Sequence, residues 1–246
     1  GLRTLRIAGH AMATGAVAGE DPVSLMSGLN IDFESASATE SDDVNGAEVA
    51  YELLNEADKP KPIYLGMAGL DDMVFIMPDN FITLRAPAGV GKTAFLLSAV
   101  LNLLPSKKVW FVSLEMSAKD LMARALCQLA MVDIDAMMMD RLSQDERGRL
   151  AKAANDYGHI LKNLLIDNAG TMNIDVFRAK AEHKVKNEKV ELIIIDYAQL
   201  MDADAKRYPN RTDQLESISK GIRATARTLE VPVLCVVHVN KEGVEH

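Results

Sequence analysis

The spacing of apolar residues changes along the chain near residue 63. Before that point, residues 2–18 and 47–55 have helical periodicity, and a second short helical stretch follows residue 22. Between them, residues 34–46 are acidic, small and polar, so they cannot bury enough apolar surface to order themselves. We therefore predict that residues 1–60 form a helical linker region containing a flexible acidic segment.

From residue 63 onward, short β-branched runs alternate with helical stretches. Strands are predicted at residues 81–84, 109–114, 164–166, 190–195 and 231–239. Helices are predicted at residues 93–104, after residue 117, at 174–187 and along an apolar face from 215 to 229. Strands that are apolar on both faces and alternate with helices indicate a parallel sheet covered on both sides. Residues 61–246 are thus predicted to form one α/β domain.

Composition adds little to this picture except by exclusion. Cys127 and Cys235 lie in apolar segments without C-x-x-C spacing, which favours reduced core residues over a disulfide or zinc site. No apolar run approaches the roughly 20 residues that a membrane span needs, so we expect a cytoplasmic protein without a membrane partner. The three consecutive methionines at 137–139 are interpreted as packing at a helix end or subunit contact. Because the chain begins with Gly1 and not Met, we expect it to be part of a longer protein.

The net charge of −8 argues against a broad basic face for double-stranded DNA. It leaves open a narrow channel whose loops are locally basic.

A phosphate-binding loop is predicted at residues 86–93, APAGVGKT, directly between the first strand and its helix. The pattern G-x-x-x-x-G-K-[ST] is met except that Ala86 replaces the first glycine. Lys92 is expected to reach the phosphates of ATP and Thr93 to ligate Mg²⁺, at a helix N-terminus that attracts anions. An ordinary glycine-rich turn is the alternative, which the flanking strand and helix disfavour. The residues expected to surround the nucleotide here are Ala88, Gly89, Val90, Gly91, Lys92 and Thr93.

Three further groups stand at predicted strand ends, where open parallel sheets bind ligands. Asp196 follows four apolar residues, a pattern typical of the carboxylate that orients Mg²⁺; the alternative is a turn cap. Glu115 is the candidate for polarising the attacking water, if its strand neighbours that of the phosphate loop; the alternative is an exposed helix entrance. His238 could donate a hydrogen bond to the γ-phosphate, or be satisfied by neighbouring backbone.

Several segments resemble the helicase domain of DnaB-type replicative helicases. They are SLEMSAKDLMARAL at 113–126, LIIIDYAQLM at 192–201, the stretch 218–241, and the Gly69-Leu70-Asp71 approach to the phosphate loop. The similarity runs from about residue 63 to 241, and residues 1–55 resemble more weakly the linker before that domain. It implies a RecA-like P-loop NTPase fold, with a mostly parallel twisted sheet, helices on both faces and a helical linker before it.

The resemblance also implies roles and partners. Lys92 and Thr93 bind nucleotide and magnesium, Glu115 becomes the catalytic glutamate, and Asp196 the magnesium-orienting aspartate. A γ-phosphate sensor is implied at His238, where bacterial members usually carry Gln and related phage primase-helicases carry His, which favours a phage or phage-derived origin. Arg124 is a further candidate for facing the nucleotide. The implied function is an ATP-hydrolysing DNA helicase acting as a homohexamer, with a primase and a helicase loader as candidate partners.

The resemblance also indicates what lies outside the sequence. The family's arginine finger and second DNA-binding loop are expected beyond His246, and its primase-binding domain before Gly1. Because a neighbouring subunit's arginine supplies transition-state charge in such rings, a single copy should hydrolyse ATP poorly.

A short basic segment follows the strand of Asp196. Lys206, Arg207 and Arg211 lie near Tyr208 in a loop that faces the central channel in RecA-like rings, so we predict contacts to single-stranded DNA. A solvated turn is the alternative.

Two other classes of function stay open at this point. One is a RecA-like recombination or repair ATPase, and the other is a nucleotide-dependent switch or loader-like scaffold. The segments at 113–126 and 192–201 favour the helicase over both.

Overall fold

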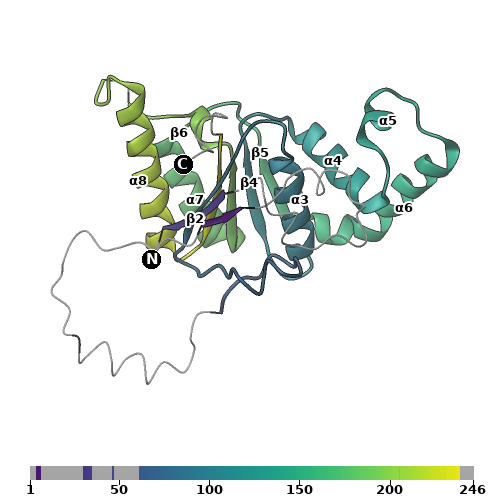
Figure 1. The fold of residues 1–246 in the computed structure, drawn as a ribbon, viewed down its shortest axis with the longest axis horizontal. Coiled ribbons are helices and arrows are strands. Elements are labelled where there is room, and N and C mark those ends of the chain that lie inside the picture. The colour runs from purple at the N-terminus through teal and green to yellow at the C-terminus, as the bar shows by residue number, and fades with distance from the viewer. Residues whose placement is uncertain (1–3, 7–29, 35–45, 47–60, 205, 239–246) are drawn as a thin grey trace.

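A seven-stranded sheet forms the centre of the computed structural model, which describes residues 4–6, 30–34, 46, 61–204 and 206–238. Its strand order is β1-β2-β3-β9-β7-β4-β5, and the last five strands pair in parallel (Figure 1). These five are β3 (Phe81–Ala86), β9 (Val233–His238), β7 (Leu192–Asp196), β4 (Val109–Ser113) and β5 (Leu164–Asp167). Each lies where the sequence predicts a strand, with ends that differ by a few residues.

The alternation of side chains along the strands supplies two separate cores. Phe111 of β4 and Ile194 of β7 pack into one hydrophobic cluster, whereas Trp110 and Ile195 of the same strands pack into another. Successive side chains of a strand point to opposite faces, so a run of apolar residues must be covered twice. This explains why β4 and β7 are buried along their whole length.

Helices supply the two covers (Figure 1). One layer contains α3 (Lys92–Leu103) and α4 (Ala118–Ala130), extended by α5 (Ile134–Met138) and α6 (Gln144–Leu161). The other contains α7 (Ile174–Glu188) and α8 (Arg211–Leu229). Between β7 and α8 the chain forms a 3-10 turn, η2 (Ala198–Leu200), and a strand, β8 (Met201–Asp202), which pairs with β6 (Met172–Asn173).

The helix boundaries follow from local chemistry. Ser117 accepts a hydrogen bond from the backbone N–H of Asp120, as predicted for the start of α4. Ser143 and Glu146 form a reciprocal capping box at the start of α6. Because these caps satisfy N–H groups that have no partner within the helix, each helix begins at a defined residue.

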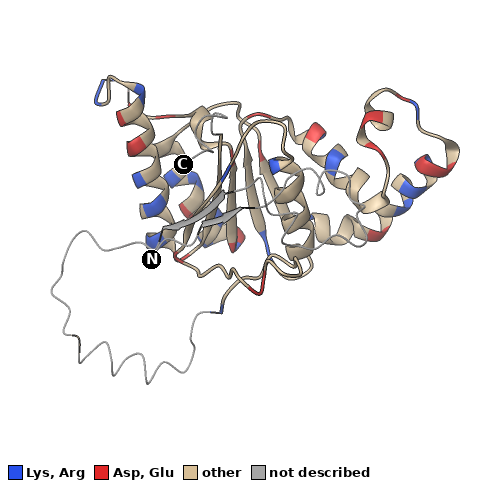
Figure 2. Cartoon of the chain, viewed as in Figure 1, with Lys and Arg blue, Asp and Glu red and all other residues tan. Residues whose placement is uncertain are grey.

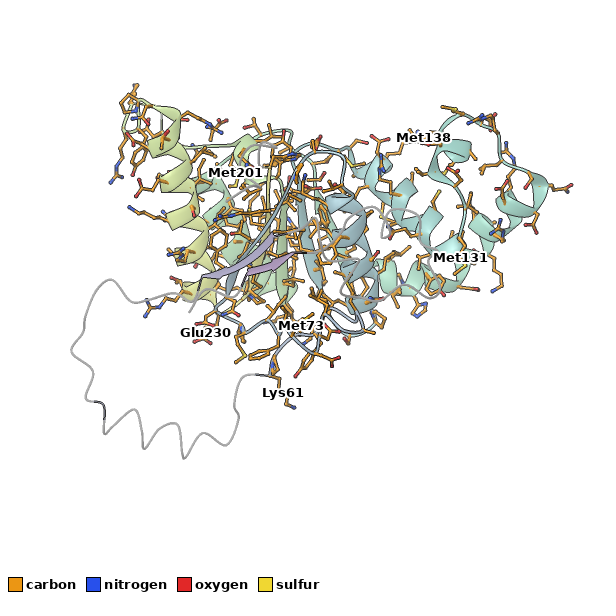
Figure 3. All side chains as sticks on the ribbon, in the orientation of Figure 1. Lys61, Met73, Met131, Met138, Met201 and Glu230 are labelled. Atoms are coloured by element: carbon orange, nitrogen blue, oxygen red, sulfur yellow. The ribbon has the colours of Figure 1, made fainter. Side chains whose placement is uncertain are left out.

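The methionine run lies at the end of α5, as expected. Met137 packs against the small cluster of Cys127 and Val132, whereas Met138 and Met139 are largely exposed. Met131 and Met138 lie at the end of the molecule formed by α4–α6 (Figure 3).

The helix prediction for the first segment is wrong where the structure describes it. β1 (Thr4–Arg6) and β2 (Asn30–Glu34) are strands, and β2 pairs antiparallel with β3 at the edge of the sheet. Pairing with an open edge satisfies backbone groups of both strands, and this tertiary gain outweighs a local helical preference. The rest of the predicted helical linker, together with its acidic segment, lies outside the described residues. The boundary at residue 60 stays a prediction.

Gly221 on α8 sets how closely α7 and α8 approach each other. A Cβ atom added there would lie 2.5 Å from Cγ1 of Ile174. We expect Gly221→Ala to lower the free energy of unfolding by about 1–3 kcal/mol, measured by chemical denaturation, because the overpacking outweighs the better helix propensity of alanine. Gly148→Ala on α6 is the matched control, since an added Cβ there meets nothing within 4 Å. It should raise stability by up to about 1 kcal/mol. Equal effects of the two substitutions would contradict this account of the packing.

Candidate nucleotide-binding site

The loop between β3 and α3 has the conformation of an anion-binding turn. Gly89 and Gly91 have φ values of 81° and 91°, in the left-handed region that residues with a Cβ rarely adopt. Gly91 is the N-cap of α3, and no side chain caps the helix start, so its first N–H groups are free to face a ligand. Ala88 and Gly89 are exposed, and Val90 is half-buried against the first core. Ala86, in place of the usual glycine, is buried at the end of β3.

Lys92 is the first residue of α3 and is buried. Its Nζ donates hydrogen bonds to the carbonyl oxygens of Ala86 at 3.0 Å and Pro87 at 2.6 Å. Burial lowers the pKa of Lys92, while the charges of Asp196 and Glu115 act in the opposite direction. The two carboxylates therefore help to keep a buried ammonium charged beside the loop.

Thr93 and Asp196 meet across 103 residues of sequence. The Thr93 hydroxyl donates a 2.8 Å hydrogen bond to Oδ2 of Asp196, which is only 1% exposed at the end of β7. Burial raises the pKa of Asp196 to about 6, the Thr93 hydrogen bond lowers it, Glu115 raises it, and Lys92 lowers it. A hydroxyl and a carboxylate side by side are oxygen donors of the kind that Mg²⁺ accepts, with water and phosphate oxygens completing its shell. These two residues therefore fit the predicted magnesium site.

Glu115 follows β4, and its position differs from the sequence expectation. Its strand does not neighbour β3, because β9 and β7 lie between them. The exposed Glu115 nevertheless acts electrostatically on Lys92, Asp196 and His238, because the carboxyl ends of parallel strands share one edge. The turn that carries it is fixed by Ser113, whose Oγ donates to the carbonyl of Met116 and accepts from its N–H.

His238 ends β9 directly beside Ala86 at the end of β3. Burial and the charge of Lys92 lower its pKa, while Glu115 raises it. A neutral imidazole is therefore favoured near neutral pH, with one N–H to donate. The Tyr197 ring contacts the imidazole edge-on at 4.1 Å between centroids, and Gln199 Nε2 donates to the His238 carbonyl at 2.9 Å.

Tyr197 and Gln199 were not singled out from the sequence. The available signal was their place in the segment LIIIDYAQLM, one and three residues after Asp196.

The other predicted site residues are distributed less tightly. Arg124 is exposed on α4, where burial and then Asp133 raise the pKa of Cys127 and the Arg124 charge lowers it. Its expected role at the nucleotide stays a prediction. In the part of the chain that the structure describes, no group of three or more His, Cys, Asp or Glu residues could hold a metal ion. Cys127 and Cys235 are free and buried, as expected.

The basic segment after Asp196 divides into two kinds of residue. Lys206 and Arg207 are exposed, with the Arg207 guanidinium 5.4 Å from the centre of the Tyr208 ring, in the loop at the start of α8 (Figure 2). Arg211 instead donates to the carbonyl oxygens of Gln199 at 2.6 Å and Met201 at 3.0 Å. Its guanidinium is thus already bound within the chain, and contacts of all three cations to DNA stay predictions.

Residues 63–246 match the family model described as the DnaB-like helicase C-terminal domain. The replicative DNA helicase DnaB of Rickettsia prowazekii (strain Madrid E) is 29% identical over 192 residues, which cover 73% of this chain and 39% of that protein. The corresponding protein of Geobacillus stearothermophilus is 29% identical over 179 residues, covering 72% of this chain and 39% of that protein. The chain therefore spans about two fifths of the length of these relatives.

Solved structures agree on the architecture. The ATPase domain of a phage protein superposes with a TM-score of 0.69 at 26% identity, covering 84% of this chain and 75% of that one. A DnaB-like replicative helicase, described with its interactions with primase, has a TM-score of 0.69 at 24% identity. It covers 86% of this chain and 52% of that one, and supports the fold alone. No helix among the described residues is long and apolar enough to cross a membrane.

The burial of Asp196 predicts an unusual pH dependence of stability. Because the folded state holds this proton up to about pH 6, the contribution of Asp196 to the free energy of unfolding falls as pH rises from about 4 to about 6. Asp196→Asn removes that cost, so the variant should match the wild type near pH 4 and exceed its stability by about 3 kcal/mol above pH 6. Chemical denaturation of the metal-free and nucleotide-free proteins at several pH values measures the difference. Asp72→Asn, at an exposed position, should give a small difference that does not change with pH, and a flat Asp196→Asn difference would contradict the prediction.

Proposed function

Since the chain belongs to the DnaB-like helicase C-terminal domain family, we propose that it hydrolyses ATP to drive a replicative DNA helicase. In this proposal a homohexameric ring moves along single-stranded DNA and unwinds the duplex ahead of it. Relatives named replicative DNA helicase support the assignment, and so does the fold shared with the phage ATPase domain. The proposed setting is the bacterial cytoplasm, for a bacterial or a phage protein.

The observation that carries the proposal is the 2.8 Å hydrogen bond between Thr93 and Asp196 beside the buried Lys92. A buried carboxylate and a buried ammonium are costly unless they serve each other or a charged ligand. The helix N-terminus and the two left-handed glycines supply N–H groups for phosphate at the same edge. Together these features suit Mg²⁺-ATP better than an uncharged ligand.

Each group has a proposed task in hydrolysis. Lys92 neutralises charge on the β- and γ-phosphates, and Thr93 and Asp196 hold Mg²⁺, which when bound offsets charge on the phosphate oxygens. Glu115, exposed and ionisable at the rim, accepts a hydrogen bond from the attacking water and orients it in line with the γ-phosphate. His238 donates a hydrogen bond from its neutral imidazole to the γ-phosphate. Gly89 and Gly91 let the loop approach the phosphates closely.

Single-stranded DNA is the proposed polymeric ligand. Lys206 and Arg207 project from an exposed loop, and Tyr208 lies next to them for stacking. A few cations per subunit, repeated around a ring, can hold a phosphate backbone although the whole chain has a net charge of −8. A primase is a proposed partner, by analogy with the DnaB-like helicase whose structure is described with primase, and a helicase loader is a second.

Two substitutions test the chemistry. Lys92→Ala should abolish nucleotide binding and hydrolysis, whereas Glu115→Gln should retain binding and lose about 10²–10³-fold in kcat, because only water activation is removed. Steady-state hydrolysis with single-stranded DNA and equilibrium binding of a fluorescent ATP analogue measure the two effects. Glu182→Gln, on the exposed face of α7, is the control and should behave as the wild type. Retained hydrolysis in Glu115→Gln would show that another group orients the water.

The assembly separates the proposal from its alternatives. Mass photometry with ATP should give closed rings of six subunits, whereas open filaments would favour a recombination ATPase. Hydrolysis that single-stranded DNA does not stimulate would favour a switch or scaffold.

The DNA loop has its own test. Lys206→Ala combined with Arg207→Ala should weaken binding of oligothymidylate and reduce the slope of log K against log salt by about 0.7 for each phosphate that is no longer neutralised. Fluorescence anisotropy at several salt concentrations measures both quantities. Lys152→Ala, on α6 and paired with Asp156, is a control that removes a positive charge outside the loop. An unchanged slope in the double variant would exclude this loop as the DNA-binding element.

A further inference from the structure

The segment that follows Asp196 is fastened to its surroundings at successive peptide groups. The Thr171 hydroxyl donates to the Leu200 carbonyl at 3.1 Å and to the Asp202 carboxylate at 2.6 Å. In addition, β8 pairs in parallel with β6. The stem of the basic loop is therefore a fixed structure, so a displacement of η2 is expected to reach the loop instead of being absorbed on the way.

Gln199 connects this segment to the strand end that carries His238. Its Nε2 donates to the His238 carbonyl at 2.9 Å, across 39 residues of sequence. Its Oε1 is buried and accepts no hydrogen bond from the residues that the structure describes. A buried amide oxygen without a donor costs on the order of 1–3 kcal/mol, so the bond to His238 is what favours this orientation of the amide. Because the contact is to the backbone of His238, it follows the position of the strand end and not the charge of the imidazole.

Arg211 connects the same turn to the loop. Its Nη2 donates to the carbonyl oxygens of Gln199 and Met201, and its Nη1 donates at 2.9 Å to Oε1 of Gln214. Gln214 in turn donates from Nε2 to the Tyr208 carbonyl at 2.9 Å. Hydrogen bonds from a guanidinium are stronger than those between neutral groups, and its planar fork fixes the direction of each. The chain of contacts thus runs without a break from His238 to Tyr208, next to Lys206 and Arg207.

We infer that Gln199 and Arg211 are positioning residues that couple the phosphate site at His238 to the DNA-binding loop. The inference rests on the proposed function. It also gives Arg211 a task that differs from the one expected from the sequence, since its guanidinium holds the loop stem and need not touch DNA. The Gln199–His238 and Arg211–Gln199 contacts form the link, and either substitution should break it.

The quantity to measure is the coupling between nucleotide state and DNA affinity. It is the ratio of the Kd values for labelled oligothymidylate with Mg²⁺-ADP and with a non-hydrolysable Mg²⁺-ATP analogue. Gln199→Glu keeps the shape of the side chain but removes the Nε2 donor, and Arg211→Gln removes the fork. Each should bring the ratio to within about twofold of one, from a wild-type ratio in the roughly 5–150-fold range typical of allosteric coupling. Arg211→Lys should give an intermediate ratio, because an ammonium can reach the carbonyl oxygens but lacks the fork.

Matched controls separate positioning from general damage. Gln144→Glu and Arg147→Gln make the same chemical changes at exposed positions on α6 and should leave the ratio unchanged. Nucleotide affinity and the thermal midpoint are measured for every variant, since a purely structural role would alter these and not the ratio. If Arg211→Gln does not fold, Gln199→Glu decides the question alone.

Two results would overturn the inference. One is a wild-type ratio preserved in folded Gln199→Glu, and the other is a wild-type ratio of one. In either case ATP hydrolysis stimulated by single-stranded DNA would leave the proposed function intact, whereas its absence in the wild type would remove the proposed function itself.

Discussion

The shared direction of the strands β3, β9, β7 and β4 is the constraint on which the rest of the site depends. Parallel strands have their carboxyl ends at one edge, so residues that follow different strands are brought together without any contact between the strands' other ends. Ala86, His238, Asp196 and Glu115 come from these four ends in the order of the strands across the sheet. Reversing any one strand would move its residue to the opposite edge.

Burial gives this edge its electrostatic character. Asp196 is almost fully buried and its pKa is raised to about 6, while burial lowers the pKa of Lys92. Each charge offsets part of the cost of the other, and the Thr93 hydroxyl contributes a hydrogen bond to the carboxylate. Such a site is energetically unfavourable in a folded protein, and a charged ligand with its metal ion would offset most of that cost.

The two hydrophobic cores keep this edge rigid. α3, which begins with Lys92 and Thr93, packs almost its whole length into the first core, so the two side chains cannot shift without moving the helix. On the other face, Gly221 lets α7 and α8 approach closely, and α8 begins at Arg211 beside the turn that follows Asp196. Family membership confirms the resemblance drawn from the segments at 113–126 and 192–201, and the shared fold confirms the RecA-like architecture.

The sequence by itself determined the elements and the phosphate loop. Apolar runs of strand length, a glycine pattern before Lys92 and the cap at Ser117 are local signals, because each depends on residues within about four positions. The order of strands is not local, so the expectation that Glu115 lies on a neighbour of β3 was wrong, and only the tertiary structure placed β9 and β7 between them. The same holds for β1 and β2, whose pairing with the sheet overrides their local preference for helix. The bonds of Gln199 and Arg211 likewise join residues up to 39 positions apart, which no spacing rule in the chain can reveal.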